Sequence, residues 1–295
     1  MMDGRLVAER LKPQLRAYGQ ELRSKHGLVP SLAAVLVGDD PASALYVRNK
    51  QRLCRELGFG TELFTMSDAR TTTDHLRGLI REINGDRRFT GILVQLPLPP
   101  AVDKFAALDV IDPGKDVDAL TPTNTMYFYR GEEGPFLPCT PRGILTLLEF
   151  YQIATQGTDA VVIGRNDITG KPMAVILGGR LCNATVTWCH AYTRDLTKHT
   201  READILVSCV GKDVGRPFLI TADMVKKGAV VVDVSIRRVG GRLVGDVDAR
   251  EVAHKAAYLT PVPGGVGPMT VVSLMQNLVD AARCAAGLAK AHYRL

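Results

Sequence analysis

Six short apolar runs, separated mostly by helix-like segments, constrain the fold of this 295-residue chain more than any other feature. Apolar runs without polar alternation are typical of parallel strands buried on both faces of a sheet. A weaker strand at residues 62–65, between helical patterns around Tyr46 and at residues 73–84, would complete a βαβαβ unit before residue 97. The alternation predicts an α/β fold. The six runs occupy residues 32–37, 91–96, 160–163, 184–188, 205–210 and 229–234.

A turn-rich stretch at residues 97–141 has no clear periodicity, and the strand–helix alternation restarts near residue 160. We therefore predict two α/β domains, residues 1–142 and residues 143–267. The remaining segment, residues 268–295, is rich in alanine and helical in pattern. We expect this C-terminal helix to return to the first domain and to complete it.

The composition limits the location and the partners. No apolar run approaches the roughly 18 residues of a membrane span, so we expect a cytoplasmic protein. Six cysteines occur without a CxxC pair, and we therefore expect no bound metal and no disulfide framework. The net charge of +6 and the pI near 9.0 favour anionic partners, but lysine and arginine are scattered among acids. We expect a small-molecule substrate rather than nucleic acid or a membrane.

One helical pattern contains a lysine within an apolar stripe. At helical spacing Lys50 shares a face with Tyr46, Leu53, Cys54 and Leu57. A lysine held against apolar surface loses hydration, which lowers its pKa and frees the amine to act as a base or nucleophile. Alternatively the four-carbon stem lies along the core and the ammonium group reaches water. Periodicity alone leaves both interpretations open.

Polar residues follow the third apolar run and continue in a later loop. Ligands of open parallel sheets bind beyond the carboxyl ends of the strands, and Gln95 stands at that position. In the loop with Lys115 and Asp116, Asp118 precedes apolar residues and could be partly buried. A carboxylate there could pair with N–H groups of a heterocycle or hold a cation. The alternatives are a structural glutamine and a solvated surface turn.

The second half opens with a strand, a turn from Gly164 to Thr169 and a helix start near Pro172. Glycine in the turn lets the backbone approach a ligand, and helix N-terminal N–H groups suit a phosphate. The spacing is not GxGxxG, so a plain strand–helix turn remains an alternative. The next strand is followed by no acid for a ribose hydroxyl before Asp195, whereas Arg165 and Arg194 could meet a 2′-phosphate. These residues favour NADP over NAD.

A loop with three glycines between prolines, residues 260–270, joins a short strand to the last helix. Such a loop bends sharply and leaves backbone N–H groups open. Its length predicts a binding loop, and a hinge is the alternative.

Together these segments resemble the bifunctional methylenetetrahydrofolate dehydrogenase/cyclohydrolase family, of the FolD type. The resemblance runs from Asp3 to the last helix through YVRNK, GILVQLPLP, KDVDA, PCTPRGILTLLE, GRNDITGKP, VGDVD and TPVPGGVGPMT. It implies that NADP, or NAD in some members, oxidises 5,10-methylenetetrahydrofolate, and that the methenyl product is hydrolysed to 10-formyltetrahydrofolate in the same cleft. It also implies a folate-binding domain at residues 1–142, completed by 268–295, and a Rossmann-type NAD(P)-binding domain at 143–267.

The resemblance implies roles for individual residues. Lys50 is the catalytic lysine, Tyr46 borders the folate, Gln95 contacts Lys50, and Asp118 binds the pterin edge. Further substrate contacts are implied for Ser43, Leu96, Pro97, Pro261, Gly264 and Gly265. Cofactor contacts are implied for Gly164, Arg165, Asn166, Thr169, Gly170, Pro172, His190, Arg194, Val210, Gly211, Asp233, Ser235, Ile236, Gly267 and Thr270. The resemblance also implies a homodimer through the nucleotide-binding halves, with contact at a sheet edge near residues 229–234 or at short strands around residues 239–244.

Departures from the family pattern lie mainly in the cofactor half. Asn166 stands where serine is usual, Thr169 where valine is usual, and Ala191 where serine is usual. The usual DVGIN contains Ser235 and Arg237 here, and KDVDG ends in Ala119. The altered cofactor half leaves a cyclohydrolase with a degenerate cofactor site as one alternative to the bifunctional enzyme. The basic pI leaves a folate- or nucleic-acid-binding protein without catalysis as another.

Overall fold

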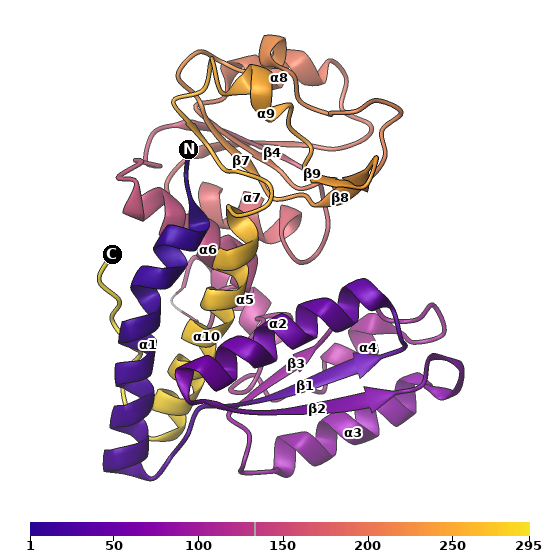
Figure 1. Ribbon diagram of the computed structural model, residues 1–295, viewed down its shortest axis with the longest axis vertical. Coiled ribbons are helices and arrows are strands. Elements are labelled where there is room, and N and C mark those ends of the chain that lie inside the picture. Colours follow the sequence, from indigo (N-terminus) through magenta and orange to yellow (C-terminus); the bar gives the residue numbers. More distant parts are fainter. Residues whose placement is uncertain (133) are drawn as a thin grey trace.

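The computed structural model describes residues 1–132 and 134–295, and it has two lobes that are each built around a sheet (Figure 1). The strands are β1 (Ser31–Val37), β2 (Gly60–Met66), β3 (Gly91–Val94), β4 (Asp159–Ile163), β5 (Thr185–Cys189), β6 (Ile205–Ser208), β7 (Val230–Asp233), β8 (Arg237–Val239), β9 (Arg242–Val244) and β10 (Tyr258–Leu259). The first lobe has the order β2-β1-β3, and the second has the order β10-β7-β6-β4-β5. Strands β8 and β9 form a separate antiparallel hairpin. Neighbours within the two larger sheets are parallel, which confirms the predicted α/β class.

Helices cover both sheets. They are α1 (Gly4–His26), α2 (Pro41–Leu57), α3 (Thr73–Gly85), α4 (Lys104–Leu108), α5 (Pro122–Arg130), α6 (Cys139–Phe150), α7 (Gly170–Gly178), α8 (Leu196–Glu202), α9 (Ala249–Val252) and α10 (Val266–Ala285), with short 3₁₀ turns η1 (Asp68–Arg70) and η2 (Ala222–Met224). None of these helices, within the described residues, is long and apolar enough to cross a membrane.

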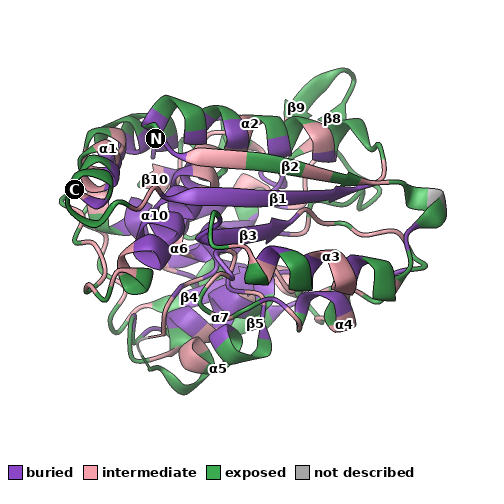
Figure 2. Cartoon of the chain, turned by 90° about the horizontal axis from the view of Figure 1, so that it is seen from below, coloured by how far each residue is buried: buried purple, intermediate pink, exposed green. Residues whose placement is uncertain are grey.

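The seven predicted strands are all present, and their ends differ from the prediction by at most two residues. Alternate residues of β1 pack on opposite sides: Ala34 and Leu36 cluster with Val47 of α2, whereas Ala33 and Val35 cluster with the core that includes α3. Burial on both faces explains the unbroken apolar run. Figure 2 shows β1 and β3 buried, whereas the edge strand β2 is partly exposed. That exposure accounts for the weaker pattern of β2.

The turn-rich stretch at residues 97–141 contains two short helices that periodicity did not reveal. The Thr121 hydroxyl accepts a hydrogen bond from Asn124 N and caps α5, Pro122 occupies its first turn, and Gly131 ends it with φ of 66°. Asp103 caps α4 in the same way. The prolines of this stretch therefore begin helices as well as turns. The predicted domain boundary at residue 142 lies within α6, and the division into domains stays a prediction.

The C-terminal helix α10 packs on α6 and α1 and also contacts α2, β1 and β3. Figure 1 shows α10 between α1 and the rest of the first lobe, so the predicted return to that lobe is confirmed. The predicted helical extent of 268–295 is wrong at its C-terminal end, because α10 stops at Ala285 and Gly287 has φ of 72°. The last residues run back along α1, where the Tyr18 hydroxyl donates a hydrogen bond to His292 O at 2.6 Å.

The carboxyl ends of the central strands in the second lobe lie side by side. Ile163 of β4 pairs with Ser208 of β6, and Ser208 pairs with Asp233 of β7. The loops that follow these strands therefore meet at one edge of the sheet, where open parallel sheets bind their ligands.

Candidate active site

A cavity of about 270 Å³ lies between the lobes and collects residues from both. It is lined by Tyr46 and Lys50 of α2, by Gln95 and Leu96 after β3, and by Asp118. The opposite wall comes from α6, from α10 and from loops of the second lobe. Those residues are Cys139, Thr140, Ile168, Val234, Ile236, Val266, Gly267, Thr270, Val271 and Leu274, and Val94 completes the lining.

Helix α2 places Lys50 beside the core rather than in it. The Asp40 carboxylate accepts a hydrogen bond from Ser43 N at 2.8 Å, which begins the helix and lowers the pKa of Asp40. The buried face of α2 includes Val47 and Cys54, whereas Lys50 is half-buried and the Tyr46 side chain is exposed. Leu53, Cys54 and Leu57, which the sequence pattern placed on the same face as Lys50, are buried as predicted, whereas Tyr46 is not. The Lys50 side chain lines the cavity at this face, and its stem can lie along apolar surface while its amine reaches the cavity.

The amine of Lys50 meets Gln95. Lys50 Nζ donates a hydrogen bond to Gln95 Oε1 at 3.1 Å, and Gln95 Nε2 donates to Leu96 O at 2.7 Å. The second bond holds the amide so that its oxygen faces the lysine. The structure thus brings together two residues that lie 45 positions apart in the sequence.

The loop after residue 114 contains one buried and one accessible carboxylate. Asp116 accepts hydrogen bonds from Thr121 N at 2.8 Å and Asn124 Nδ2 at 2.9 Å. Burial raises the pKa of Asp116, although these hydrogen bonds oppose the shift. Asp118 is half-buried and lines the cavity. The loop geometry therefore depends on Asp116 and leaves Asp118 available to a ligand.

Cys139 is a cavity residue to which sequence reasoning gave no role. Its thiol donates a hydrogen bond to Val117 O at 3.3 Å and is almost fully buried. Burial, with the neighbouring carboxylate of Asp118, raises the pKa of this thiol well above its ordinary value. The only sequence signal was its place in the PCTP segment. Cys139 is thus a neutral apolar wall beside Lys50.

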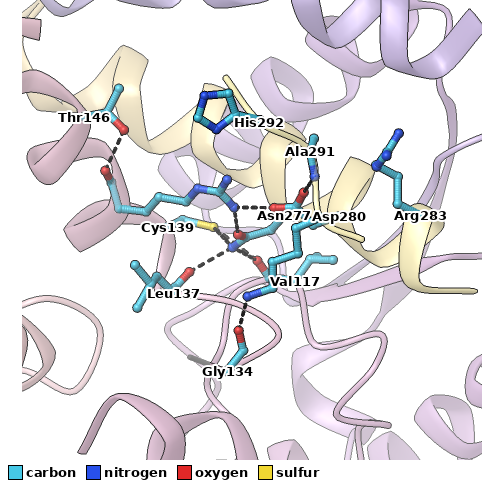
Figure 3. Close-up of polar contacts among 12 residues, drawn as sticks. Val117, Gly134, Leu137, Cys139, Thr146, Asn277, Asp280, Arg283, Ala291 and His292 are labelled. Atoms are coloured by element: carbon cyan, nitrogen blue, oxygen red, sulfur yellow. Dashed lines mark hydrogen bonds and ion pairs between the residues drawn. The ribbon is translucent and has the colours of Figure 1, made fainter. Parts of the chain in front are cut away.

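A buried amide on α10 holds the loop that carries Asp118 (Figure 3). Asn277 Nδ2 donates hydrogen bonds to Val117 O at 2.7 Å and to Leu137 O at 2.9 Å. Arg142 Nη1 donates to Asn277 Oδ1 at 2.5 Å and to the buried Asp280 carboxylate at 2.8 Å. The backbone on either side of the cavity wall is therefore tied to α10 through one side chain. These contacts were not predicted, because they join residues more than 130 positions apart.

The turn between β4 and α7 is built for close backbone approach. Gly164 has φ of 116°, and a Cβ at this position would lie 2.8 Å from Cys209 O. Asn166 Oδ1 accepts hydrogen bonds from Thr169 N at 2.8 Å and Gly170 N at 3.3 Å, and Asn166 Nδ2 donates to Cys209 O at 2.9 Å. Asn166 therefore supports the turn from within, and Pro172 follows inside the first turn of α7.

The loop after β5 provides cationic and aromatic groups where a ribose would be expected. The Arg165 guanidinium carbon lies 5.6 Å from the centroid of the Tyr192 ring. His190 packs edge-on against the same ring, and Arg194 is exposed on this loop. The surface around Arg165 thus suits a phosphate better than a neutral sugar hydroxyl.

Two buried carboxylates organise the loops after β6 and β7. Asp246 accepts hydrogen bonds from Ser208 Oγ at 2.7 Å, Ser235 Oγ at 2.5 Å, Val210 N at 2.9 Å and Gly211 N at 3.1 Å. Burial raises the pKa of Asp233 to about 7, with the charge of Asp246 adding to the shift and backbone hydrogen bonds opposing it. The side chains of Asp233 and Ser235 are buried and form hydrogen bonds within the protein. Asp246 lies in the VGDVD segment but was not singled out.

Several predicted site residues lie outside the lining of the cavity: Ser43, Pro97, Pro261, Gly264 and Gly265. Gly264 has a clear structural use, because its carbonyl accepts hydrogen bonds from Gly4 N at 3.0 Å and Arg5 N at 3.2 Å. The glycine-rich loop therefore holds the first turn of α1. Ile236, Gly267 and Thr270, predicted for the cofactor, line the cavity next to the predicted folate residues. Among the described residues no group of three His, Cys, Asp or Glu side chains is placed to hold a metal ion.

Comparisons with known proteins agree with this arrangement. Residues 2–118 match the tetrahydrofolate dehydrogenase/cyclohydrolase catalytic domain, and residues 138–286 match the NAD(P)-binding domain of the same family. The bifunctional protein FolD of Oleidesulfovibrio alaskensis is 47% identical over 281 residues, which cover 95% of this chain and 96% of that protein. The crystal structure of FolD from Campylobacter jejuni has a TM-score of 0.91 and 44% identity, covering 96% of this chain and 98% of that chain.

A FolD structure from Trypanosoma brucei, complexed with NADP cofactor and inhibitor, has a TM-score of 0.89 and 35% identity, covering 96% of this chain and 97% of that chain. These similarities extend over nearly the whole length and include both lobes. They confirm the resemblance inferred from the motifs. The chain belongs to the tetrahydrofolate dehydrogenase/cyclohydrolase family.

Proposed function

We propose that this protein oxidises 5,10-methylenetetrahydrofolate to 5,10-methenyltetrahydrofolate with NADP, and hydrolyses the methenyl product to 10-formyltetrahydrofolate. The observation that carries the proposal is the Lys50–Gln95 hydrogen bond in a cavity that also contains Asp118 and residues of the second lobe. A folate in this cavity lies against the catalytic amine and faces the cofactor half at the same time.

The first lobe, residues 1–142 completed by α10, is proposed to bind folate, and residues 143–267 to bind the cofactor. Asp118 would accept hydrogen bonds from N–H groups of the pterin, because its carboxylate is half-buried and charge-assisted hydrogen bonds are strong in such places. The Tyr46 ring, exposed at the mouth of the cavity, would pack on the folate. Leu96 would contact the substrate directly. Ser43, Pro97, Pro261, Gly264 and Gly265 remain predicted contacts.

Hydrolysis needs a proton taken from water and a proton given to a ring nitrogen. The Lys50 amine would accept the proton as water adds to the methenyl carbon. The same group would return it to the nitrogen as the carbon–nitrogen bond breaks. Gln95 would keep Nζ pointed at the reacting carbon through its 3.1 Å hydrogen bond. One residue thus serves as base and acid in a single turnover.

The second lobe fits a dinucleotide. Gly164, with φ of 116° and no side chain, would let the backbone of the turn before α7 approach a diphosphate. Arg165 and Arg194 would meet the 2′-phosphate, which favours NADP. When bound, NADP accepts the hydride from the methylene carbon. His190, Val210, Gly211, Ile236, Gly267 and Thr270 are the remaining proposed neighbours of the cofactor, with Asp233 and Ser235 supporting their loops from within.

Steady-state kinetics with NADP and NAD side by side test this proposal. One charge-assisted contact contributes about 1.5–3 kcal/mol, so kcat/KM should favour NADP by about tenfold or more. Decay of added methenyltetrahydrofolate, followed without cofactor, measures the hydrolase alone. Equal or better kcat/KM with NAD would overturn the cofactor assignment, and absence of both half-reactions would overturn the proposed function.

A cyclohydrolase without dehydrogenase activity is the second candidate, favoured by the altered segment after β7. Ser235 stands there at the position where glycine is usual in this family, and its hydroxyl donates a hydrogen bond to the Asp246 carboxylate at 2.5 Å. Hydrolysis of the methenyl compound with no reduction of NADP or NAD would support this candidate. We further propose a homodimer and a cytoplasmic location, which both remain predictions.

A further inference from the structure

An ion pair crosses from the first lobe to the turn that precedes α7. Lys104 at the start of α4 pairs with Asp167 Oδ2, and Lys171 Nζ contacts Asp167 Oδ1 at 2.5 Å. The Lys104 and Asp167 side chains are 31% and 33% exposed. Among the ion pairs that the described residues form, this is the only one that joins residues 1–132 to the second lobe.

The pair stands close to the active site. Lys104 and Asp167 line a neighbouring cavity of about 370 Å³, together with Trp188 of the second lobe. Leu96 and Ile168 line this cavity and the active-site cavity as well. A change in the separation of Lys104 and Asp167 therefore alters the wall that the two cavities share.

The turn that contains Asp167 is bound to the start of α7. Asn166 Oδ1 accepts hydrogen bonds from Thr169 N and Gly170 N, and these bonds tie the turn to that helix. Burial raises the pKa of Asp167, but hydrogen bonds from the two lysines outweigh burial and the pKa is lowered overall. The carboxylate is therefore charged at neutral pH and holds both amines.

We infer that Lys104 is a positioning residue for hydride transfer: its ion pair with Asp167 docks the cofactor turn on the folate lobe and sets the alignment of the two rings. This inference rests on the proposed function. Hydride transfer needs both lobes in register, since small misplacements of reacting groups are costly. Hydrolysis needs only the cavity around Lys50. Loss of the pair should therefore affect one activity and spare the other.

A ligand-free measurement tests the docking itself. Trp188 is the single tryptophan of the chain, is 42% exposed, and donates a hydrogen bond to Gly164 O at 2.7 Å. In Lys104→Met its fluorescence should shift to the red, and acrylamide should quench it more strongly. The matched control is Lys226→Met, which removes a 2.5 Å ion pair with Asp204 inside the second lobe. Emission of Lys104→Met identical to that of wild type and of the control would overturn the inference.

The two half-reactions test the consequence. In Lys104→Met the dehydrogenase kcat/KM should fall by about three- to tenfold, while the cyclohydrolase rate stays at the wild-type value. Lys104→Arg should restore the dehydrogenase, and Lys226→Met should change neither activity. Equal losses in both half-reactions, or no loss in either, would overturn the positioning role. A wild-type protein without dehydrogenase activity would instead refute the proposed oxidation step, while the Trp188 shift would still report the docking.

Discussion

Lys50 is the residue on which the two proposed activities divide. Its amine has a neutral hydrogen-bond partner in Gln95 and lies within the same cavity as the carboxylate of Asp118. In dehydrogenation the amine only helps to position the folate, whereas in hydrolysis it must accept a proton and return it. A change that removes the amine but keeps the stem therefore separates the two roles.

We predict that Lys50→Met lowers the cyclohydrolase rate by about 10²–10⁴-fold, the usual contribution of general acid–base assistance, and lowers the dehydrogenase rate much less. The free energy of unfolding should change little, because Lys50 is half-buried on an apolar face and its amine donates one hydrogen bond, to Gln95. Assays of the two half-reactions measure the separation. Arg48→Met, on an exposed position of the same helix, is the charge control. An equal loss of both activities in a folded variant would assign Lys50 to folate positioning alone.

Gln152 offers a test of backbone strain away from the site. It follows α6, is exposed, and has φ of 55°, a conformation that costs a residue with a side chain about 1–2 kcal/mol. Glycine removes this cost, but its greater conformational entropy in the unfolded chain lowers the free energy of unfolding by about 0.4–1 kcal/mol. Gln152→Gly should therefore raise the free energy of unfolding by about 0.5–1 kcal/mol in urea titration. Gln156→Gly, exposed and without a positive φ, should lower it; a fall in both variants would refute the strain.

At the scale of elements, α10 links the returning end of the chain to the loop that carries Asp118. Asn277→Ala removes two donors and one acceptor. Leu137 O then loses this partner, Val117 O keeps only the Cys139 thiol, and Arg142 Nη1 keeps only Asp280. Unsatisfied buried groups cost about 1–3 kcal/mol each, so unfolding should become easier by about 2–4 kcal/mol.

The same variant should raise the KM for folate more than the KM for NADP, because the loop around Asp118 loses its anchor. Denaturant titration and steady-state kinetics measure the two effects. Thr146→Ala is the control within the same network, since its hydroxyl bonds to Arg142 O at 2.9 Å and touches no part of that loop. Unchanged folate KM in a destabilised Asn277→Ala would show that the anchor serves stability only.

The sequence predicted strands well and short helices poorly. Strands buried on both faces are continuous apolar runs, whereas α4 and α5 depend on single caps such as Asp103 and Thr121. At the site, Gln95 and Asp118 could be found because strand ends and polar loops mark a ligand edge. Asn277 could not be found, since its amide inside a helix donates hydrogen bonds to carbonyls more than a hundred residues away in the sequence.

At the scale of the whole molecule, one of the two surfaces predicted for the dimer contact remains available. A sheet edge near residues 229–234 is wrong as the contact, because β7 pairs on both sides with β6 and β10. The β8-β9 hairpin exposes Val239 and Leu243, which are 43% and 40% accessible, and Ile236 lies beside it. These apolar side chains could be covered by the same hairpin of a second copy.

We predict a mass near twice the 32.0 kDa of the chain by light scattering at micromolar concentrations. Replacement of Val239 and Leu243 by Asp together should return it to the monomer, because two charges would have to be buried at the contact. Leu181→Asp alters a side chain that is 62% exposed elsewhere and should leave the mass unchanged. A monomeric wild type would exclude the dimer.

Each covalent connection between the lobes has a helix at one end: α6 leads into β4 through residues 151–158, and β10 leads into α10 through residues 260–265. The two helices pack on each other, and Thr140 and Thr270 meet at 3.1 Å beside the cavity. Because two packed helices rather than one flexible linker join the lobes, we expect any opening of the cleft to pivot near the contact of α6 and α10. The cavity wall beside that contact would then change least, and the rim at Arg165 would move farthest.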